Sequence, residues 1–334
     1  MDQEYILKDW EKLELEVLQE SIFTDNLLAF LKQTIIGQEA LLERLLIGLF
    51  GNGHLLLESV PGLAKTLAVK TLAQTIHANF SRIQFTPDIL PADILGTTIY
   101  NMQTHEFSVK KGPVFSNFVL ADEINRAPEK VQSALLEVMQ ERQVTIGNTT
   151  YLIAPPFLVL ATQNPLDQGG TYELPEAQMD RFMLKIIITY PSLEDERIII
   201  RNNIKPVKPI SDPSFTKEEI FKVQSLVKRI HIDKKIEDYI LNIIFCSRFP
   251  ERYSLPDLKQ YIRFGSSPRG SINLAMAARA HAFLRKRAYV IPEDVQAVAP
   301  DVLRHRIGLT YSAKAENLTA DYLIKEILSS IPTP

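Results

Sequence analysis

The sequence predicts an α/β protein in which a largely parallel sheet is followed by a smaller helical domain. Between about residues 55 and 190, apolar runs of strand length alternate with segments of helical periodicity, a pattern that favours parallel strands joined by crossover helices. A proline-rich stretch at 205–213 then indicates a linker. Four segments beyond it repeat their apolar residues with the helical period, near 216–230, 233–247, 271–287 and 293–304.

The expected organisation has an N-terminal helical segment, an α/β core, a linker and a helical lid. Residues 1–35 form the first segment, because Leu13, Val17, Leu18 and Ile22 recur at helical spacing. The core covers 36–204, the linker 205–213 and the helical domain 214–334. A chain of 334 residues suits two main domains.

Composition is that of a globular protein, with 46% hydrophobic and 23% charged residues. No apolar run approaches the roughly 20 residues of a membrane-spanning helix, and the first residues lack the basic and apolar regions of a signal peptide. The single cysteine, Cys246, excludes a disulfide within the chain and is interpreted as a core residue. We therefore expect a cytoplasmic protein without a membrane span.

Charge is divided unevenly along the chain, although the net charge is only −3. Residues 1–195 hold 14 Lys and Arg against 25 Asp and Glu, a net charge of −11, whereas residues 196–334 hold 23 against 15, a net charge of +8. Opposite charges suit head-to-tail contact between subunits of a homo-oligomer. They also suit contact between the domains of one chain, or binding of an acidic partner or nucleic acid by the basic half.

A lysine-containing loop follows the first predicted strand. The apolar run at 55–57 leads into a loop that ends in Lys65 and Thr66, and a helix pattern follows. Such a strand–loop–helix binds phosphates through backbone N–H groups, a lysine and a hydroxyl that contacts Mg²⁺. The common pattern G-x-x-x-x-G-K-[ST] has glycines where this chain has Ser59 and Ala64, so the match is imperfect; Gly62 is retained.

Two later strands end in polar residues that would complete a nucleotide site. The apolar run at 114–121 ends in Asp122 and Glu123, which would hold Mg²⁺ through water and polarise the attacking water. The next run, at 157–161, leads to Asn164, which could orient that water. Alone, two adjacent carboxylates more often begin a helix than form a catalytic pair, and the asparagine before a proline could equally form a turn. Their order after the lysine loop favours the nucleotide site.

These segments together resemble the MoxR family of AAA+ ATPases, a group with inserts near the second core helix that is related to the ATPase subunits of magnesium chelatase. The resemblance covers about residues 36 to 306, and Ala64 fits the family pattern whereas Ser59 replaces a usual glycine. It is carried by the stretches 36–39, 60–66, 84–96, 121–128, 136–146, 161–165, 174–182, 267–270 and 301–306.

The resemblance implies a role for each matching position. Lys65 and Thr66 correspond to the Walker A pair, Asp122 and Glu123 to Walker B, with Thr66 and Asp122 at the Mg²⁺. Asn164 corresponds to sensor 1, Arg181 to an arginine finger that reaches a neighbouring subunit, and Arg269 to sensor 2. The ATP-binding positions are Ile36 and Gly37 near adenine, and Ser59, Val60, Pro61, Gly62, Leu63, Ala64, Lys65, Thr66 and Leu67 around the phosphates.

Arg269 also stands out on physical grounds. Ser267 and Pro268 are typical of a helix N-cap and first position, and a cation in the first turn is opposed by the helix dipole. A partner anion would explain an arginine there, although a solvated arginine is the simpler alternative. For Arg181, a surface ion pair with Asp180 or Glu176 is the corresponding alternative.

Two segments with alternating polarity are expected to be β-hairpins, near 95–111 and 143–153. The family resemblance implies that such inserts move with nucleotide state and contact the client. His105, between the first pair of strands, has no accompanying ligand residues, so we interpret it as an exposed hairpin residue rather than a metal ligand.

The resemblance implies an ATP- and Mg²⁺-dependent homo-oligomer, expected to be a six-fold ring, that remodels or matures a protein client. Its partner is expected to be a protein with a von Willebrand factor A (VWA) domain, and its role to lie in metal-cofactor insertion or complex assembly. Two alternatives stay open: a nucleotide-gated assembly adaptor that hydrolyses little ATP, because Ser59 replaces glycine, and a nucleic-acid motor. The acidic core argues against the motor.

Overall fold

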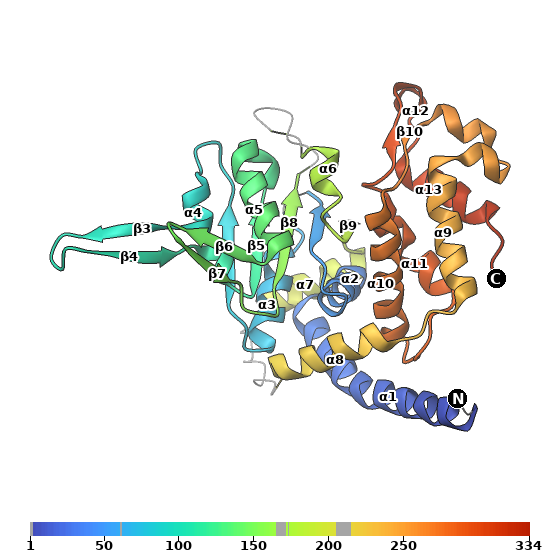
Figure 1. Cartoon of the computed structure of the whole chain (residues 1–334), viewed down its shortest axis with the longest axis horizontal. Coiled ribbons are helices and arrows are strands. Elements are labelled where there is room, and N and C mark those ends of the chain that lie inside the picture. Colours follow the sequence, from blue (N-terminus) through green and yellow to red (C-terminus); the bar gives the residue numbers. More distant parts are fainter. Residues whose placement is uncertain (1–2, 61, 165–171, 173, 205–214) are drawn as a thin grey trace.

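The computed structural model describes residues 3–60, 62–164, 172, 174–204 and 215–334. Figure 1 shows an α/β core beside a group of C-terminal helices, with a long N-terminal helix running below both. A β-hairpin projects from the far side of the core. The linker predicted at 205–213 lies outside the described residues.

The centre of the core is a five-stranded parallel sheet, as the sequence predicts. The strand order β2-β5-β8-β1-β9 differs from the sequence order, so the connections cross over between neighbouring strands. The bounds are β1 (Leu55–Glu58), β2 (Phe80–Gln84), β5 (Phe118–Asp122), β8 (Leu158–Gln163) and β9 (Leu184–Ile187).

Both faces of the sheet are buried, which explains why its strands are continuous apolar runs. On β1, Leu55 and Leu57 join a large hydrophobic cluster that also includes side chains of the N-terminal and lid helices. Leu56, between them, points to the other face and joins a second cluster. Because all five strands are parallel, their carboxyl ends lie at one edge of the sheet, where residues that follow the strands can form a site.

The core helices come before, between and after the strands of the sheet along the chain. They are α2 (Glu39–Phe50), α3 (Lys65–Thr75), α4 (Pro91–Leu95), α5 (Glu129–Glu141), α6 (Glu176–Met179) and α7 (Leu193–Ile204). The N-terminal helix α1 (Gln3–Thr34) buries Val17, Leu27 and Leu31 in the large cluster. It therefore packs as part of the folded body along its C-terminal half.

The lid consists of helices and one short pair of strands. Its helices are α8 (Lys217–Arg229), α9 (Lys234–Arg248), α10 (Pro268–Leu284), α11 (Pro292–Leu303), α12 (Tyr311–Ala315) and α13 (Ala320–Ser330), and its strands are β10 (Ile262–Phe264) and β11 (Gly308–Leu309). Ser267 caps α10 by accepting a hydrogen bond from the Arg269 N–H at 3.1 Å. The strand pair was not expected from the sequence, because its strands are only two or three residues long.

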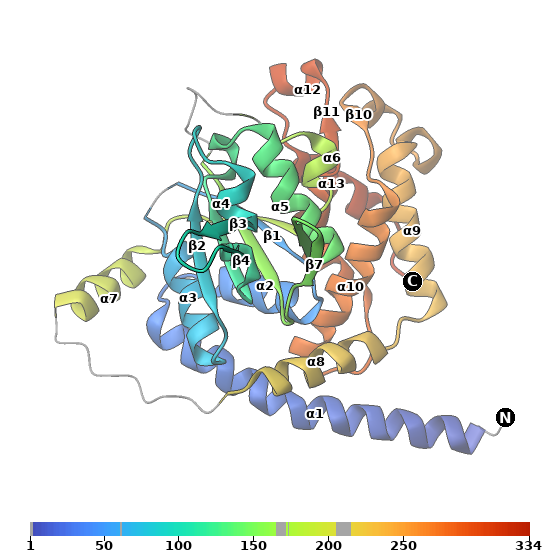
Figure 2. The ribbon, with the colours of Figure 1, turned by 60° about the vertical axis from the view of Figure 1, so that its left-hand side comes forward.

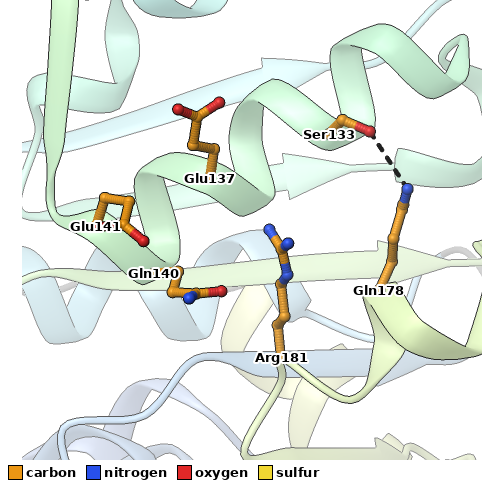
Figure 3. Close-up of a pocket in the computed structure, with 6 residues that line it drawn as sticks. All are labelled: Ser133, Glu137, Gln140, Glu141, Gln178 and Arg181. Atoms are coloured by element: carbon orange, nitrogen blue, oxygen red, sulfur yellow. Dashed lines mark hydrogen bonds between the residues drawn. The ribbon is translucent and has the colours of Figure 1, made fainter.

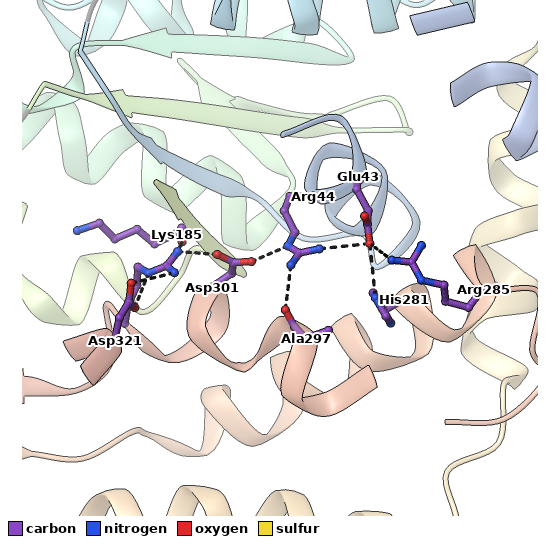
Figure 4. A network of polar contacts seen from close by, with 9 residues as sticks. Glu43, Arg44, Lys185, His281, Arg285, Ala297, Asp301 and Asp321 are labelled. Carbon is purple, nitrogen blue, oxygen red and sulfur yellow. Dashed lines mark hydrogen bonds and ion pairs between the residues drawn. The ribbon is translucent and has the colours of Figure 1, made fainter. Parts of the chain in front are cut away.

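An ion-pair network centred on the buried Asp301 joins the lid to the core (Figure 4). Arg44 of α2 donates to Asp301 of α11 at 2.5 Å and to the Ala297 carbonyl at 2.9 Å. Arg304 then bonds the other oxygen of Asp301, the carbonyl of Lys185 on β9, and Asp321 of α13. Breaking such a pair leaves a buried charge uncompensated, so the network fixes how the lid sits on its own core.

Both predicted hairpins are present, β3 (Gly96–Asn101) with β4 (Glu106–Lys111), and β6 (Gln143–Ile146) with β7 (Thr149–Leu152). His105 lies in the first hairpin turn and forms a 2.9 Å hydrogen bond with the Tyr100 hydroxyl. At its base, the Lys111 ammonium lies 4.9 Å from the ring centroids of both Phe115 and Tyr151. Because Tyr151 belongs to β7, this lysine joins one hairpin to the other.

Two further features of the described chain concern its environment. Among the described residues, no helix combines the length and apolar character that crossing a bilayer requires. Cys246 is buried in α9, and burial raises the pKa of its thiol to about 11. The thiol is therefore protonated at neutral pH, as suits a core residue.

Stability should depend on pH through His54, which lies at the start of β1. Its Nε2 lies 3.0 Å from the Met139 carbonyl, and its Nδ1 accepts from the Val159 N–H at 3.0 Å. Burial lowers the pKa of His54 from 6.5 to about 4, and Arg142 acts in the same direction. Below about pH 6.5 the unfolded chain therefore binds a proton that the folded protein does not, and stability falls as pH falls toward 4.

We expect the parent to lose about 2 kcal/mol more unfolding free energy than His54→Gln between pH 7 and pH 5. Urea denaturation at both pH values measures this difference. The exposed His77 offers a control, since His77→Asn should keep the parent's pH dependence. Equal losses for the parent and His54→Gln would contradict the assignment.

Candidate nucleotide site

The loop between β1 and α3 has the backbone form of an anion-binding turn. Gly62 has a φ of +89° and Ala64 a φ of +56°, both in the left-handed region. At Gly62, apart from its immediate chain neighbours, no described residue lies within 4 Å of the position that a Cβ would occupy. The backbone conformation, rather than crowding, therefore favours glycine there. Lys65 and Thr66 then begin α3, whose N-terminus favours a negatively charged ligand.

Ser59 does not obstruct this loop, although the common pattern has glycine there. Its side chain is buried, and its hydroxyl donates to the adjacent Val60 carbonyl at 3.0 Å. Its N–H donates to the carbonyl of Gln163 on β8 at 3.3 Å. Ser59 does not have a positive φ, so its backbone conformation does not require glycine, and its hydroxyl bonds its own chain. Pro61 lies outside the described residues.

Lys65 and the two predicted carboxylates come together. Partial burial lowers the pKa of Lys65, while the charges of Asp122 and Glu123 act in the opposite direction and raise it. Both carboxylates thus lie within electrostatic range of the ammonium group. This follows from the sheet, because β8 alone separates β5, which carries Asp122, from β1, which leads to the lysine loop.

Thr162 of β8 joins the two carboxylate residues to the neighbouring strand. Its hydroxyl donates to Asp122 Oδ1 at 2.6 Å and accepts from the Glu123 N–H at 2.9 Å. Glu123 itself has a φ of +58°, a left-handed conformation that a non-glycine residue adopts at some energetic cost. The threonine hydroxyl thereby fixes the direction of Asp122 and the turn at Glu123.

Three residues not predicted from the sequence hold the carboxylates in place. Arg82 of β2 donates to Asp122 Oδ2 through Nη2 at 2.6 Å and Nε at 3.1 Å. Gln84, two residues along the same strand, donates to Glu123 Oε2 at 2.8 Å, and Arg126 approaches that oxygen at 3.1 Å. The available signal was the pair of polar residues with a spacing of two at the end of β2, beside β5 in the sheet.

Asn164 directly follows β8, the strand between the lysine loop and the carboxylates. Thr66 and Leu67 lie in the first turn of α3, while Val60 and Leu63 pack against the large core cluster. The structure therefore places the predicted phosphate-binding and carboxylate residues at one edge of the sheet.

Ile36 and Gly37 connect α1 to α2, and they lie against the start of α7. Gly37 has a φ of +71°, and a Cβ there would come within 2.9 Å of Pro191 and 2.7 Å of Asp195. Glycine is thus required both by conformation and by space. The adenine position that the family resemblance implies is consequently next to the N-terminal end of α7.

Arg181 and Arg269 form a separate group. Arg181 follows α6 and points into a cavity of about 270 Å³ beside α5, lined also by Ser133, Glu137, Gln140, Glu141 and Gln178 (Figure 3). Within the part of the chain that the structure describes, Arg181 forms no ion pair. Arg269 donates to Gln140 at 3.3 Å and lies 3.7 Å from Asp180. Both arginines line a second cavity of about 170 Å³.

The polar residues of this site suit the binding of Mg²⁺ and a nucleoside triphosphate. A carboxylate and a hydroxyl are suitable oxygen ligands for Mg²⁺, and Asp122 and Thr66 supply them at the same sheet edge. A lysine in the first turn of a helix is unfavourable unless anions lie nearby. A triphosphate would provide such anions in addition to Asp122 and Glu123.

The fold and this site define a P-loop ATPase of the AAA+ class. Residues 54–184 match the model of the ATPase family associated with various cellular activities (AAA), and residues 257–327 match the AAA lid domain. The chain belongs, more narrowly, to the MoxR family, as its relatives show.

The chain is 48% identical over 322 residues to the chaperone MoxR1 of Mycobacterium tuberculosis, covering 96% of this chain and 83% of that protein. It is 28% identical to the protein MoxR of Methylorubrum extorquens, covering 90% and 92% of the two chains. The crystal structure of a candidate ATPase from Cytophaga hutchinsonii superposes with a TM-score of 0.90 at 46% identity, covering 98% of this chain and 99% of that one.

Removing the Thr162 hydroxyl should destabilise the protein. Thr162→Val leaves a buried Asp122 oxygen and the Glu123 N–H without their partner, so we expect the free energy of unfolding to fall by about 1–3 kcal/mol. Thr162→Ser keeps the hydroxyl and should lose less. Chemical denaturation of the three proteins tests this, and a Val variant as stable as the parent would exclude the linking role of Thr162.

Proposed function

We propose that this chain hydrolyses ATP with Mg²⁺ in a homo-oligomeric ring, expected to be hexameric, and uses the reaction to remodel a protein client. The observation that carries the proposal is the meeting of Lys65 with Asp122 and Glu123 at the carboxyl edge of the sheet. Membership of the MoxR family supports the ATPase class, and the name of the relative MoxR1 supports a chaperone role.

In the proposed mechanism each residue has a limited task. Thr66 and Asp122 would hold Mg²⁺, which when bound neutralises the phosphate oxygens. Lys65 and the loop N–H groups bind the phosphates, and Asn164 orients the attacking water. Glu123 accepts a proton from that water, and the Thr162 hydroxyl holds the Glu123 backbone in place.

The two arginines are proposed to act on the neighbour's nucleotide. Arg181 and Arg269 line a common cavity, and Arg269 contacts Gln140 and Asp180 rather than the Lys65 site of its own chain. An arginine supplied from a neighbouring subunit stabilises charge on the transferred phosphoryl group. In a head-to-tail ring, one face of each subunit would present the lysine loop and the opposite face these arginines.

The projecting hairpins are the proposed client contacts. The β3–β4 hairpin exposes apolar side chains including Tyr100, Met102 and Phe107, with Met102 82% exposed and Phe107 74% exposed. Exposed apolar residues at a projecting tip suit binding to a protein. We propose a cytoplasmic role in complex assembly or metal-cofactor insertion, through a partner with a VWA domain.

One observation favours the adaptor alternative. Both carboxylates are engaged, Asp122 by Arg82 and Glu123 by Gln84 and Arg126. While these contacts hold, neither carboxylate is free for catalysis, so a subunit in this arrangement could bind nucleotide without hydrolysing it. A parent protein that assembles with ATP but shows no steady-state phosphate release would support the adaptor rather than the remodelling ATPase.

Glu123→Gln should retain ATP binding but lower turnover by about 10²–10⁴-fold, because the amide cannot accept the proton of the attacking water. Phosphate release and binding of a fluorescent ATP analogue measure the two properties. Glu129→Gln removes an exposed carboxylate from the start of α5 and is the matched control. Turnover of Glu123→Gln at the parent's rate would refute the site assignment.

Mixing two inactive variants should restore part of the activity if Arg181 acts between subunits. Arg181→Ala lacks the arginine and Lys65→Ala lacks the phosphate ligand, but an interface between them can hold both groups. Because such an arginine contributes roughly 10³–10⁵ in rate, even a fraction of restored sites should be measurable as phosphate release.

The control for this mixture is Arg181→Ala combined with the double variant Arg181→Ala/Lys65→Ala, which supplies no missing arginine. Native mass spectrometry confirms that mixed oligomers form. Mixed oligomers without recovered activity would contradict the shared site.

A further inference from the structure

Helix α7 is unusual among the longer helices of the described chain, because none of its residues is buried. Leu193 is 72% exposed, Ile200 57% and Ile204 78%. Figure 2 shows α7 at the periphery of the molecule, on the side of the core away from the lid helices. Because none of its isoleucines is buried, this helix gains little from packing in the single subunit to offset the ordering of its backbone.

Three of the four exposed apolar residues of α7 form one stripe, and the fourth, Ile198, which is 41% exposed, lies off it. Leu193, Ile200 and Ile204 are spaced by seven and four residues, which places them on the same side of a helix. The opposite side is directed to the body through Asp195, which lies against Gly37, and through the less exposed Ile199. The stripe therefore faces solvent in the single subunit, and an apolar helix face of this kind suits docking to another protein surface.

The position and charge of α7 indicate what covers it. Its N-terminal end contacts Gly37 through Asp195, so α7 lies beside the proposed adenine position, where a neighbouring subunit would approach the nucleotide. The first turn carries three carboxylates, at Glu194, Asp195 and Glu196. Glu194 pairs with Arg197 at 2.9 Å and Asp195 accepts from the Ser192 hydroxyl at 2.6 Å, so the turn keeps a net negative charge. A partner surface should therefore combine an exposed apolar residue with positive charge.

The same chain has such a surface at the start of α10. Ile272 is 63% exposed and lines the cavity shared by Arg181 and Arg269. Ile272 follows Arg269 by three residues, so the apolar and basic side chains lie on one face of the helix. Figure 2 shows α10 and α7 on different sides of the molecule, as a head-to-tail contact between copies requires.

We propose that α7 is the docking helix of the subunit interface, and that its Leu193–Ile200–Ile204 stripe packs on the Ile272 face of a second copy of this chain. The inference deepens the proposed function, since it names the surface that would bring the neighbour's Arg181 and Arg269 to the nucleotide. Leucine and isoleucine side chains would supply the contact area, and the carboxylates of α7 would face Arg269 of α10 and the adjacent Arg181.

The first test measures assembly. In the full chain carrying Glu123→Gln and loaded with ATP, Ile200→Ser/Ile204→Ser should raise the concentration of half-assembly by about tenfold or more, because two apolar contacts are lost. Its melting temperature and its binding of the fluorescent ATP analogue as a monomer should match the parent, since both side chains are exposed. Leu241→Ser, at a leucine of α9 that is 45% exposed, is the control and should assemble normally.

The second test identifies the partner surface by cross-linking. Ile200→Cys combined with Ile272→Cys should give cross-linked oligomers with ATP and a short bis-maleimide, whereas Leu241→Cys with Ile272→Cys should not. The natural Cys246 is buried and does not compete. Cross-linking of Ile200→Cys alone would show that α7 pairs with another α7 and would overturn the proposal.

The outcomes separate this inference from the proposed function. Assembly of Ile200→Ser/Ile204→Ser at the parent's concentration overturns the docking role of α7 and leaves the ATPase site standing. A parent that stays monomeric with ATP contradicts both the ring and the docking helix. Normal assembly combined with unchanged turnover of Glu123→Gln contradicts the catalytic assignment alone.

Discussion

The site depends on how the sheet brings a lysine to two carboxylates. Parallel neighbouring strands lie about 4.8 Å apart, so the order β5, β8, β1 places the ends of three strands within reach of one small ligand. Thr162 lies on β8, the middle strand, and its hydroxyl bonds both the Asp122 side chain and the Glu123 N–H. A different strand order would separate these groups without changing any of them, so the topology, rather than any one side chain, creates the site.

The contacts of the carboxylates show what nucleotide binding must change. Arg82 neutralises Asp122 at the position where the proposed Mg²⁺ ligand is needed. The Arg82 side chain is half exposed whereas Asp122 is largely buried, so Arg82 can move toward solvent only when a divalent cation takes its place as the counter-charge of Asp122. Glu123 is likewise held by Gln84 and Arg126. Both acids are thus kept in place by partners that a bound nucleotide can displace.

Much of this arrangement was predictable from the sequence, for identifiable reasons. Continuous apolar runs ending in polar residues indicated the parallel sheet and the positions of Lys65, Asp122 and Asn164, because the edge of such a sheet collects the residues that follow each strand. The two hairpins were predicted from alternating polarity. The family resemblance was confirmed by the relatives and by the matched structure.

Other features could not be read from sequence patterns, because they depend on contacts between distant segments. Arg82 and Gln84 acquire their roles only through the pairing of β2 with β5. Nothing local distinguishes the buried Ser59 hydroxyl, which bonds its own chain, from one that contacts phosphate. The isoleucines of α7 resemble core residues in the sequence, and only the fold shows that no described residue buries them.

The contacts between the lid and the core of one subunit determine which parts can move in the proposed assembly. Arg306 is buried and donates to Asp180 at 2.9 Å and to the Met183 carbonyl at 3.2 Å, and Arg44 bonds Asp301 across the same interface. A shared hydrophobic cluster accompanies these bonds. Separating lid from core would expose both, whereas the proposed contacts between subunits involve the partly exposed Arg181 and the exposed Ile272. Since Asp180 precedes Arg181 and is held by Arg306, the arginine is fixed to the whole subunit that carries it. A change at one nucleotide would therefore move the neighbouring subunit as a body, and the projecting hairpins would move with it.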